Sequence, residues 1–182
     1  MLPFQLTPQQ IETYHKDGYL IVPDFLSVEE VDKLYKIAVE DEAMRKHSFD
    51  LNDQTGKKTK LALWYTPGND AYGLLTKSRR IVKAVDQLMD GDSSVCHFHS
   101  KLMQKEPKVG GAWEWHQDYG YWYHNGCIFP HLASCQVALD RSTTANGCLQ
   151  MVQGSHLLGR IDHVPVPGEG QILVHTEAVG VN

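Results

Sequence analysis

The strongest chemical signal in this sequence is the triplet His116-Gln117-Asp118. In a β-strand, residues i and i+2 point to the same face, so a strand here would place an imidazole beside a carboxylate. One histidine and one carboxylate are two of the three ligands of a facial triad, which binds Fe(II) and leaves positions open for reactants. The triplet alone is also compatible with a polar pair on a solvated strand face.

A second signal is the alternation of residues 94–105. One face of a strand over this range would carry His97, His99, Lys101, Met103 and Lys105, which are imidazoles and cations apart from Met103. Charges are rarely buried unpaired, so this face would line either solvent or the lumen of a barrel that holds an anionic co-substrate. Lys105 would then pair with a carboxylate, and the alternative is that Lys101 and Lys105 are simply exposed.

Aromatic residues cluster directly after the triplet. They are Tyr119, Tyr121, Trp122, Tyr123 and Phe129. Such residues can form the wall of an apolar pocket with polar contacts, or they can be ordinary packing. The sequence contains no GxSxG, phosphate-binding loop, dinucleotide fingerprint or HExxH motif, so it lacks the signatures of hydrolases, nucleotide-binding proteins and zinc proteases.

Longer motifs around the triplet carry a family resemblance. The stretch KEPKVGGAWEWHQDYGYWYHNG, the later SCQVALDRSTTANGCLQMVQGSH and LGRIDH, and the N-terminal DGYLIVPDFLS resemble the phytanoyl-CoA dioxygenase family. These are Fe(II)- and 2-oxoglutarate-dependent oxygenases built on a double-stranded β-helix, or jelly roll. The resemblance implies Fe(II), 2-oxoglutarate and O₂. It also implies hydroxylation of a small-molecule substrate with release of succinate and CO₂.

The resemblance assigns roles to particular residues. His116 and Asp118 match the iron ligands, and Lys105 stands where many members have a lysine that contacts 2-oxoglutarate. Trp122 falls where some related hydroxylases place an aromatic ring against the co-substrate. Related halogenases replace the aspartate with a small residue, so the intact Asp118 implies hydroxylation. His156 belongs to the GSH signature and is not assigned to the metal.

The family's third iron ligand is a histidine on a late strand, followed about ten residues later by an arginine that binds 2-oxoglutarate. Neither pattern follows His163, where the sequence reads VPVPGEGQILVHTEAVGVN. We therefore expect the third ligand to be absent or to be His175. We also expect the 182 residues to be an N-terminal fragment or truncated form of a longer oxygenase.

Two other interpretations stay open at this point. A non-catalytic jelly-roll binding protein would keep the pocket and lack the distal histidine and arginine. A cupin-like metalloprotein that does not use 2-oxoglutarate would need several clustered histidines, for which the dense candidates are His97, His99 and His116.

The surrounding pattern predicts helices first and strands afterwards. Capping signals at Thr7 and Ser27 predict helices that run to about Gly18 and Met44, and apolar spacing predicts a third helix over 73–90. Strands are expected at 19–22, 61–65, 94–105, 113–119, 133–140 and 148–152, with a polar surface loop at 45–60 and a tight turn at Asn146-Gly147. This is an α+β arrangement.

We expect one domain over residues 1–182. Its helical part would span about 1–91, and its jelly-roll part about 92–182 would lack the last strands. The formal charge of −5 argues against a nucleic-acid partner, and no apolar run is long enough for a membrane span. Four cysteines without a CxxC pairing suggest reduced thiols of a cytoplasmic protein. The sequence does not predict the substrate or the oligomeric state.

Overall fold

The N-terminal helices begin where the sequence places their caps. The computed structural model describes residues 4–42, 46, 48–52, 58–89, 91, 95–105 and 115–162. Helix α1 spans Pro8–Asp17 and helix α2 spans Val28–Glu40, and a capping box opens each of them. Gly18, with φ of 83°, ends α1 in the left-handed conformation that glycine adopts without strain. Both predicted helix starts are confirmed.

The predicted strand at 19–22 is wrong. After Gly18 the chain runs through irregular backbone into a turn that begins at Pro23, and the side chain of Ile21 is 76% exposed. A strand requires a neighbour that accepts its backbone hydrogen bonds. The apolar run therefore serves as a connection between α1 and α2.

A three-stranded antiparallel sheet follows α2, in the order β1-β2-β3. Its strands are β1 (Phe49–Asn52), β2 (Lys58–Trp64) and β3 (Ser100–Gln104). Leu61 pairs with Phe49 on one side and with Met103 on the other. The strand expected at 61–65 is thus confirmed as part of β2. The surface loop expected at 45–60 is wrong in part, because polar residues there pair as a hairpin.

Two helices replace the single helix expected at 73–90. They are α4 (Ala71–Thr76) and α5 (Arg79–Leu88). The Ser78 hydroxyl accepts a hydrogen bond from the backbone N–H of Ile81 and so starts a new helix. A local cap therefore interrupts a pattern whose apolar spacing continues across it.

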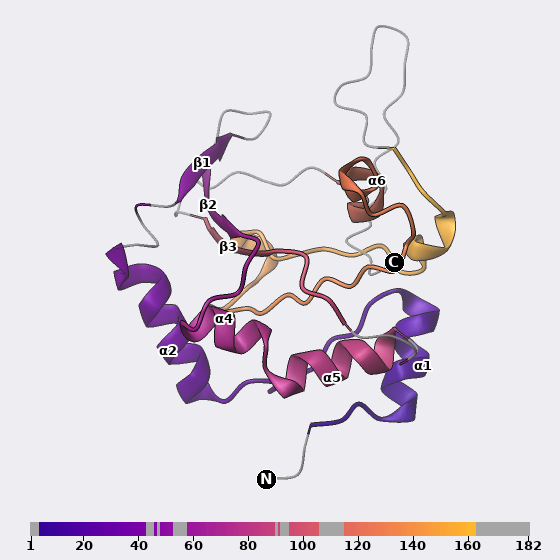
Figure 1. Ribbon diagram of the computed structural model, residues 1–182, viewed down its shortest axis with the longest axis horizontal. Coiled ribbons are helices and arrows are strands. Elements are labelled where there is room, and N and C mark those ends of the chain that lie inside the picture. Colours follow the sequence, from indigo (N-terminus) through magenta and orange to yellow (C-terminus); the bar gives the residue numbers. More distant parts are fainter. Residues whose placement is uncertain are drawn as a thin grey trace, which may run out of the picture.

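The apolar core lies between the helices and the sheet. Leu34, Ala38 and Tyr72 form a buried cluster. Partly buried Trp64 of β2 and Leu102 of β3 pack against it. Figure 1 shows α1, α2, α4 and α5 along one side of the sheet, with α6 on the opposite side of the molecule. The helices α1, α2, α4 and α5 therefore form a helical layer on one side of the molecule, and the region that contains the triplet lies away from it.

Residues 115–162 are mostly irregular and contain short helices. These are α6 (Asp118–Trp122), η1 (Tyr123–Asn125), η2 (Thr144–Asn146) and η3 (Ser155–Leu158). The strands predicted at 133–140 and 148–152 are not formed, and only 100–104 of the strand predicted at 94–105 is. The turn at Asn146-Gly147 is present, with Gly147 at φ of 80°, but it joins irregular segments.

The observed mixture of helices and a small antiparallel sheet agrees with the α+β prediction. The jelly roll stays a prediction, and the late range 163–182 lies outside the described residues. Within the described part of the chain, none of the helices has the length and apolar character needed to cross a bilayer.

Candidate iron site

The His116 and Asp118 side chains meet at the start of helix α6. His116 Nε2 lies 3.2 Å from Asp118 Oδ1, and the two side chains are 21% and 18% exposed. The predicted strand at 113–119 is wrong at its end, because Asp118 is the first residue of α6. The extended backbone of Gln117 followed by a helical turn brings the two groups together, in place of the alternation of a strand.

The second carboxylate oxygen of Asp118 is also bound. Ser134 Oγ donates a hydrogen bond to Asp118 Oδ2 at 3.1 Å. Burial acts to raise the pKa of Asp118, but hydrogen bonding and charge from His116, with smaller effects of Lys101 and Ser134, lower it below its usual value. The carboxylate is therefore ionised at neutral pH, as a metal ligand must be.

The spacing of these two donors suits a shared metal ion. Two ligands that each lie about 2.1 Å from a metal at right angles are about 3.0 Å apart. The observed 3.2 Å separation of His116 Nε2 and Asp118 Oδ1 is close to that value. An imidazole and a carboxylate are also the donor types of the Fe(II) facial triad. The pair therefore fits two of the three protein ligands of an iron site.

The third ligand is not found among the residues that the structure describes. In that part of the chain no group of three or more His, Cys, Asp or Glu side chains could hold a metal ion. This includes the cluster of His97, His99 and His116 considered for a cupin-like site. His175 lies outside the described residues.

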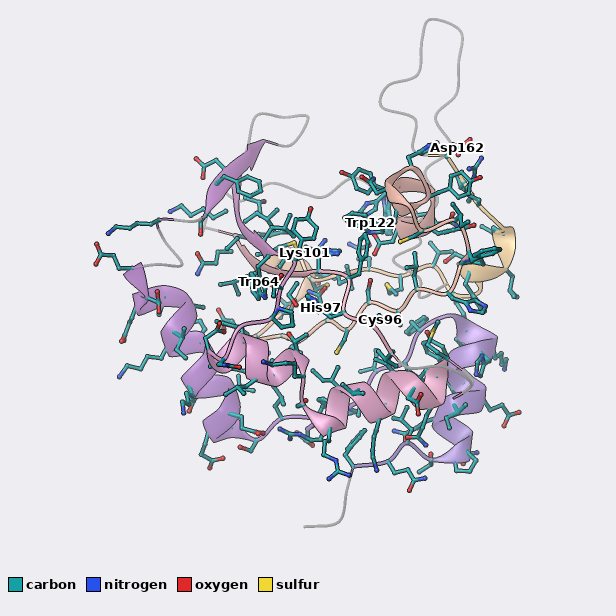
Figure 2. The ribbon with its side chains drawn as sticks, in the orientation of Figure 1. Trp64, Cys96, His97, Lys101, Trp122 and Asp162 are labelled. Atoms are coloured by element: carbon teal, nitrogen blue, oxygen red, sulfur yellow. The ribbon has the colours of Figure 1, made fainter. Side chains whose placement is uncertain are left out.

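Trp122 connects the pair to the segment that leads into β3. It lies one helical turn after Asp118, and its ring centroid is 4.6 Å from that of His99 and 5.1 Å from that of Phe98. Figure 2 shows the Trp122 side chain extending from α6 toward the part of the molecule that carries His97 and Lys101. The aromatic wall predicted after the triplet thus includes Trp122, with His99 and Phe98 contributed by another segment.

His99 and Lys101 contribute to the electrostatics of the site. Burial lowers the pKa of His99, the positive Lys101 lowers it further, and the negative Asp118 opposes the shift. His99 is therefore a neutral imidazole at pH 7. The sequence placed His99 and Lys101 on one strand face with Lys105. Residues 95–99 are irregular instead, and the His97 ring forms hydrogen bonds with the Tyr65 carbonyl and the Ser100 hydroxyl.

Lys105 lies one residue beyond β3 and is exposed. Its Nζ donates a hydrogen bond to the Gly147 carbonyl oxygen at 3.2 Å. The ammonium group is therefore directed to the turn that follows η2, whereas Ser134 donates a hydrogen bond to Asp118 and the charge of Lys101 acts on the same carboxylate. The structure thus brings His116, Asp118 and Trp122 into one region and attaches Lys105 to a different loop.

Sequence analysis missed Ser134 as a partner of the site. Ser134 lies 16 residues after Asp118 in an irregular segment, and no motif marks it. A serine at this position could be identified only from the path of the chain between α6 and η2. Lys101 was expected to line either solvent or a lumen; the structure shows it exposed, and its charge contributes to the lowered pKa of Asp118.

The chain is similar in sequence to a known family and to several curated proteins. The sequence model of the family described as Phytanoyl-CoA dioxygenase (PhyH) matches residues 14–170. L-proline trans-4-hydroxylase of Streptomyces griseoviridis is 27% identical over 156 residues, which cover 85% of this chain and 57% of that enzyme. Ectoine dioxygenase of Halomonas elongata is 25% identical over 169 residues, 90% of this chain and 49% of the enzyme.

A third relative is named for an inorganic substrate. The probable alpha-ketoglutarate-dependent hypophosphite dioxygenase of Stutzerimonas stutzeri is 25% identical over 161 residues, which cover 85% of this chain and 55% of that protein. The chain thus spans about half the length of the curated relatives that it matches.

Proposed function

The chain belongs to the phytanoyl-CoA dioxygenase family, and on that premise we propose that it is part of an Fe(II)- and 2-oxoglutarate-dependent dioxygenase. The reaction would hydroxylate a small-molecule substrate and convert 2-oxoglutarate and O₂ to succinate and CO₂. The observation that carries this proposal is the approach of His116 Nε2 to Asp118 Oδ1 within 3.2 Å at the start of α6.

In this proposal His116 and Asp118 hold the iron, and the bound iron supplies the oxidative chemistry with O₂ and 2-oxoglutarate. Ser134 keeps the Asp118 carboxylate in a fixed orientation through the bond to Oδ2. A hydrogen-bonded carboxylate that is ionised at neutral pH binds a cation without first losing a proton. His175 is the remaining candidate for the third ligand.

Two further residues belong to the proposed co-substrate site. Lys105 would bind a carboxylate of 2-oxoglutarate, which requires its ammonium to leave the Gly147 carbonyl oxygen. Exposed lysines exchange such bonds readily, because the side chain is flexible and solvated. Trp122 would pack against the co-substrate from α6, where His99 and Phe98 already contact its ring.

The names of the relatives support a small polar substrate, since two of them refer to proline and ectoine. We propose a single domain over 1–182, helical over about 1–91 and with a jelly-roll part over about 92–182. The absence of CxxC pairs in the sequence supports a cytoplasmic location.

The test is 2-oxoglutarate turnover by the wild-type protein and by Asp118→Ala. Succinate release in the presence of Fe(II), ascorbate and O₂ should fall at least about 100-fold in Asp118→Ala, because one iron ligand is lost. Asp140→Ala is the matched control. Asp140 is exposed, and its carboxylate accepts a hydrogen bond from the neighbouring backbone N–H of Arg141. Equal turnover by Asp118→Ala and the wild type would refute the proposal.

A further inference from the structure

The residue between the two proposed iron ligands is the most buried part of the site. Gln117 is 3% exposed. Its Nε2 donates to the Gly159 carbonyl oxygen at 2.7 Å, and its Oε1 accepts from the Ile161 backbone N–H at 2.8 Å. Both polar atoms of a buried amide are thus satisfied by backbone groups more than 40 residues away. One side chain joins the ligand-bearing segment to residues 159–161.

The Gln117 side chain does not cap the helix that Gln117 begins, so its amide can bond to other parts of the chain. Gln117 stands at the N-cap of α6, with φ of −102° and ψ of 124°, but its side chain makes no capping hydrogen bond. Glutamine is a poor N-cap in any case, since Ser, Thr, Asp and Asn are preferred there. The amide instead forms its hydrogen bonds with Gly159 and Ile161. These bonds fix the position of the backbone between His116 and Asp118.

A second contact brings α6 against the same segment. A Cβ on Gly120 would lie 1.8 Å from the Ile161 carbonyl oxygen, far inside van der Waals contact. Only glycine permits this approach of two backbones. The two hydrogen bonds of Gln117 therefore act beside a close backbone contact, and together they leave little freedom for the first turn of α6.

Residues 159–161 are themselves held in place from the other side. Helix η3, which precedes them, is attached to the end of α1: the Gly154 N–H donates to the Asp17 carbonyl oxygen at 2.8 Å, and His156 Nε2 lies 2.9 Å from the His15 carbonyl oxygen. The Arg160 guanidinium stacks over the Tyr123 ring at 3.9 Å. The support for Gln117 is thus connected to the helical layer.

From these contacts we propose that Gln117 is a positioning residue for the iron site: its two hydrogen bonds to Gly159 and Ile161 set the spacing of His116 and Asp118. The inference rests on the proposed function, because it assumes that these two residues bind the metal. Gln117 itself would not touch iron, co-substrate or substrate. Groups that orient metal ligands typically change metal affinity 10- to 100-fold when they are removed.

The chain offers a matched control for this residue. Gln87 makes the same pair of bonds with Leu6: its Oε1 accepts from the Leu6 N–H at 3.0 Å, and its Nε2 lies 3.4 Å from the Leu6 carbonyl oxygen. Gln87 lies in α5, in the helical layer. Gln117→Met and Gln87→Met therefore each remove two side-chain hydrogen bonds to backbone groups, one pair at the proposed site and the other away from it.

The experiment measures the affinity for Zn²⁺, a diamagnetic substitute for Fe(II), together with the thermal midpoint of the metal-free protein. We expect both variants to lower the midpoint, Gln117→Met by more because its amide is more deeply buried. Gln117→Met should in addition lower the Zn²⁺ affinity about 10- to 100-fold, whereas Gln87→Met should change it less than about twofold. An affinity of Gln117→Met within twofold of the wild type would overturn the inference and leave the proposed function intact. A wild-type chain that binds no metal would overturn both.

Backbone hydrogen exchange of the wild-type protein gives a second test that needs no folded variant. If the Gln117 hydrogen bonds increase metal affinity, bound metal must stabilise these bonds by the same free energy, because coupling between two sites is reciprocal. Saturating Zn²⁺ should therefore slow exchange of the Ile161 amide about tenfold or more, with a smaller change at the Leu6 amide. Equal slowing of both amides, or none at Ile161, would contradict the positioning role.

Discussion

The helical layer and the site region of this chain are stabilised by different kinds of contact. All the buried apolar residues of the described part except Tyr119 lie within 4–89. Of the three buried polar residues in the described part of the chain, Gln117 and Ser155 lie within 115–162. Apolar burial contributes most of the free energy of folding, whereas hydrogen bonds fix directions and distances. The helical layer, together with β2, which contributes Leu61 and Ala62, therefore supplies most of the stability, and the site region supplies position.

This difference predicts two classes of substitution. Changes in the helical layer should lower the free energy of unfolding and leave the metal affinity of the folded protein unchanged. Changes in the site region should lower metal affinity by more than their effect on stability accounts for. A substitution in the helical layer that lowers metal affinity would show that the contacts between η3 and the end of α1 couple the two regions.

The largest loss of stability is expected for Tyr72→Ala. Its ring packs in the buried cluster with Leu34 and Ala38, and its hydroxyl donates to the Leu34 carbonyl oxygen at 2.7 Å. Burial, with a smaller effect of Asp41, raises the pKa of Tyr72 to about 12, so the hydroxyl remains a donor. Removal of a buried aromatic ring costs about 3–5 kcal/mol.

Urea unfolding measures this loss. The control Tyr72→Phe keeps the ring and removes only the hydrogen bond, so it should cost about 1 kcal/mol. Zn²⁺ affinity should be unchanged in both variants where they are folded. An equal cost of the two substitutions would assign the stability to the hydrogen bond and contradict the view of this layer as an apolar core.

The next largest effect is expected for Gly120→Ala in the site region. The added methyl group would overlap the Ile161 carbonyl oxygen, so the two backbones must separate, at a cost of about 1–3 kcal/mol. The shift moves α6 away from residues 159–161, and the Zn²⁺ affinity should fall at least about tenfold.

The control for this substitution is Gly126→Ala. Gly126 has φ of +98° and open space around it, so alanine there costs about 1 kcal/mol from conformation alone. Calorimetric titration of both variants separates a steric effect on the site from a general loss of stability. An unchanged Zn²⁺ affinity in Gly120→Ala would show that this close backbone contact does not affect the iron site.

A smaller effect is expected for Ser27→Ala in the helical layer. The Ser27 hydroxyl accepts from the Glu30 N–H, and its removal from the N-cap of α2 should cost about 1 kcal/mol. Ser27→Thr retains the cap and should lie within a few tenths of a kcal/mol of the wild type. The thermal midpoints of the two variants measure the difference, and metal affinity should be the same in both.

Such caps explain why the helical layer was the part of the fold that sequence predicted best. The interaction of Ser27 with Glu30 spans three residues, so the sequence itself contains both partners. The hairpin of β1 and β2 was missed because its polar residues resemble a loop until a neighbouring strand pairs with them. Local patterns thus predicted the starts of α1 and α2 and failed where distant strands decide the structure.

In the candidate site, chemistry was predicted better than geometry. The residue types of His116 and Asp118 indicated a metal pair, and the structure brings them together through a helix start where a strand was expected. The partners of Gln117 and Asp118 lie 16 to 44 residues away along irregular backbone. No periodic pattern encodes such contacts, so they could be known only from the fold.

The smallest change in the free energy of unfolding is expected when the ion pair that links α2 to α5 is removed. Arg80 forms two hydrogen bonds to the Glu30 carboxylate, one of them 3.1 Å long, and these bonds, with the Ser27 N–H, lower the pKa of Glu30. Because the folded-state pKa lies below the unfolded one, the pair stabilises the protein above the unfolded pKa of about 4.5. This contribution is lost as pH falls through the lower, folded-state pKa.

Glu30→Gln isolates this contribution, since glutamine still accepts from the Ser27 N–H and keeps the capping box. The Arg80 and Glu30 side chains are 34% and 44% exposed, so solvent limits the loss to less than about 1 kcal/mol at pH 7. The gap between wild type and Glu30→Gln should close in acid, shrink in high salt, and vanish in an Arg80→Met background. A gap that persists at pH 2 would show that Glu30 acts by packing, and a change in Zn²⁺ affinity would show that this distant pair reaches the site region.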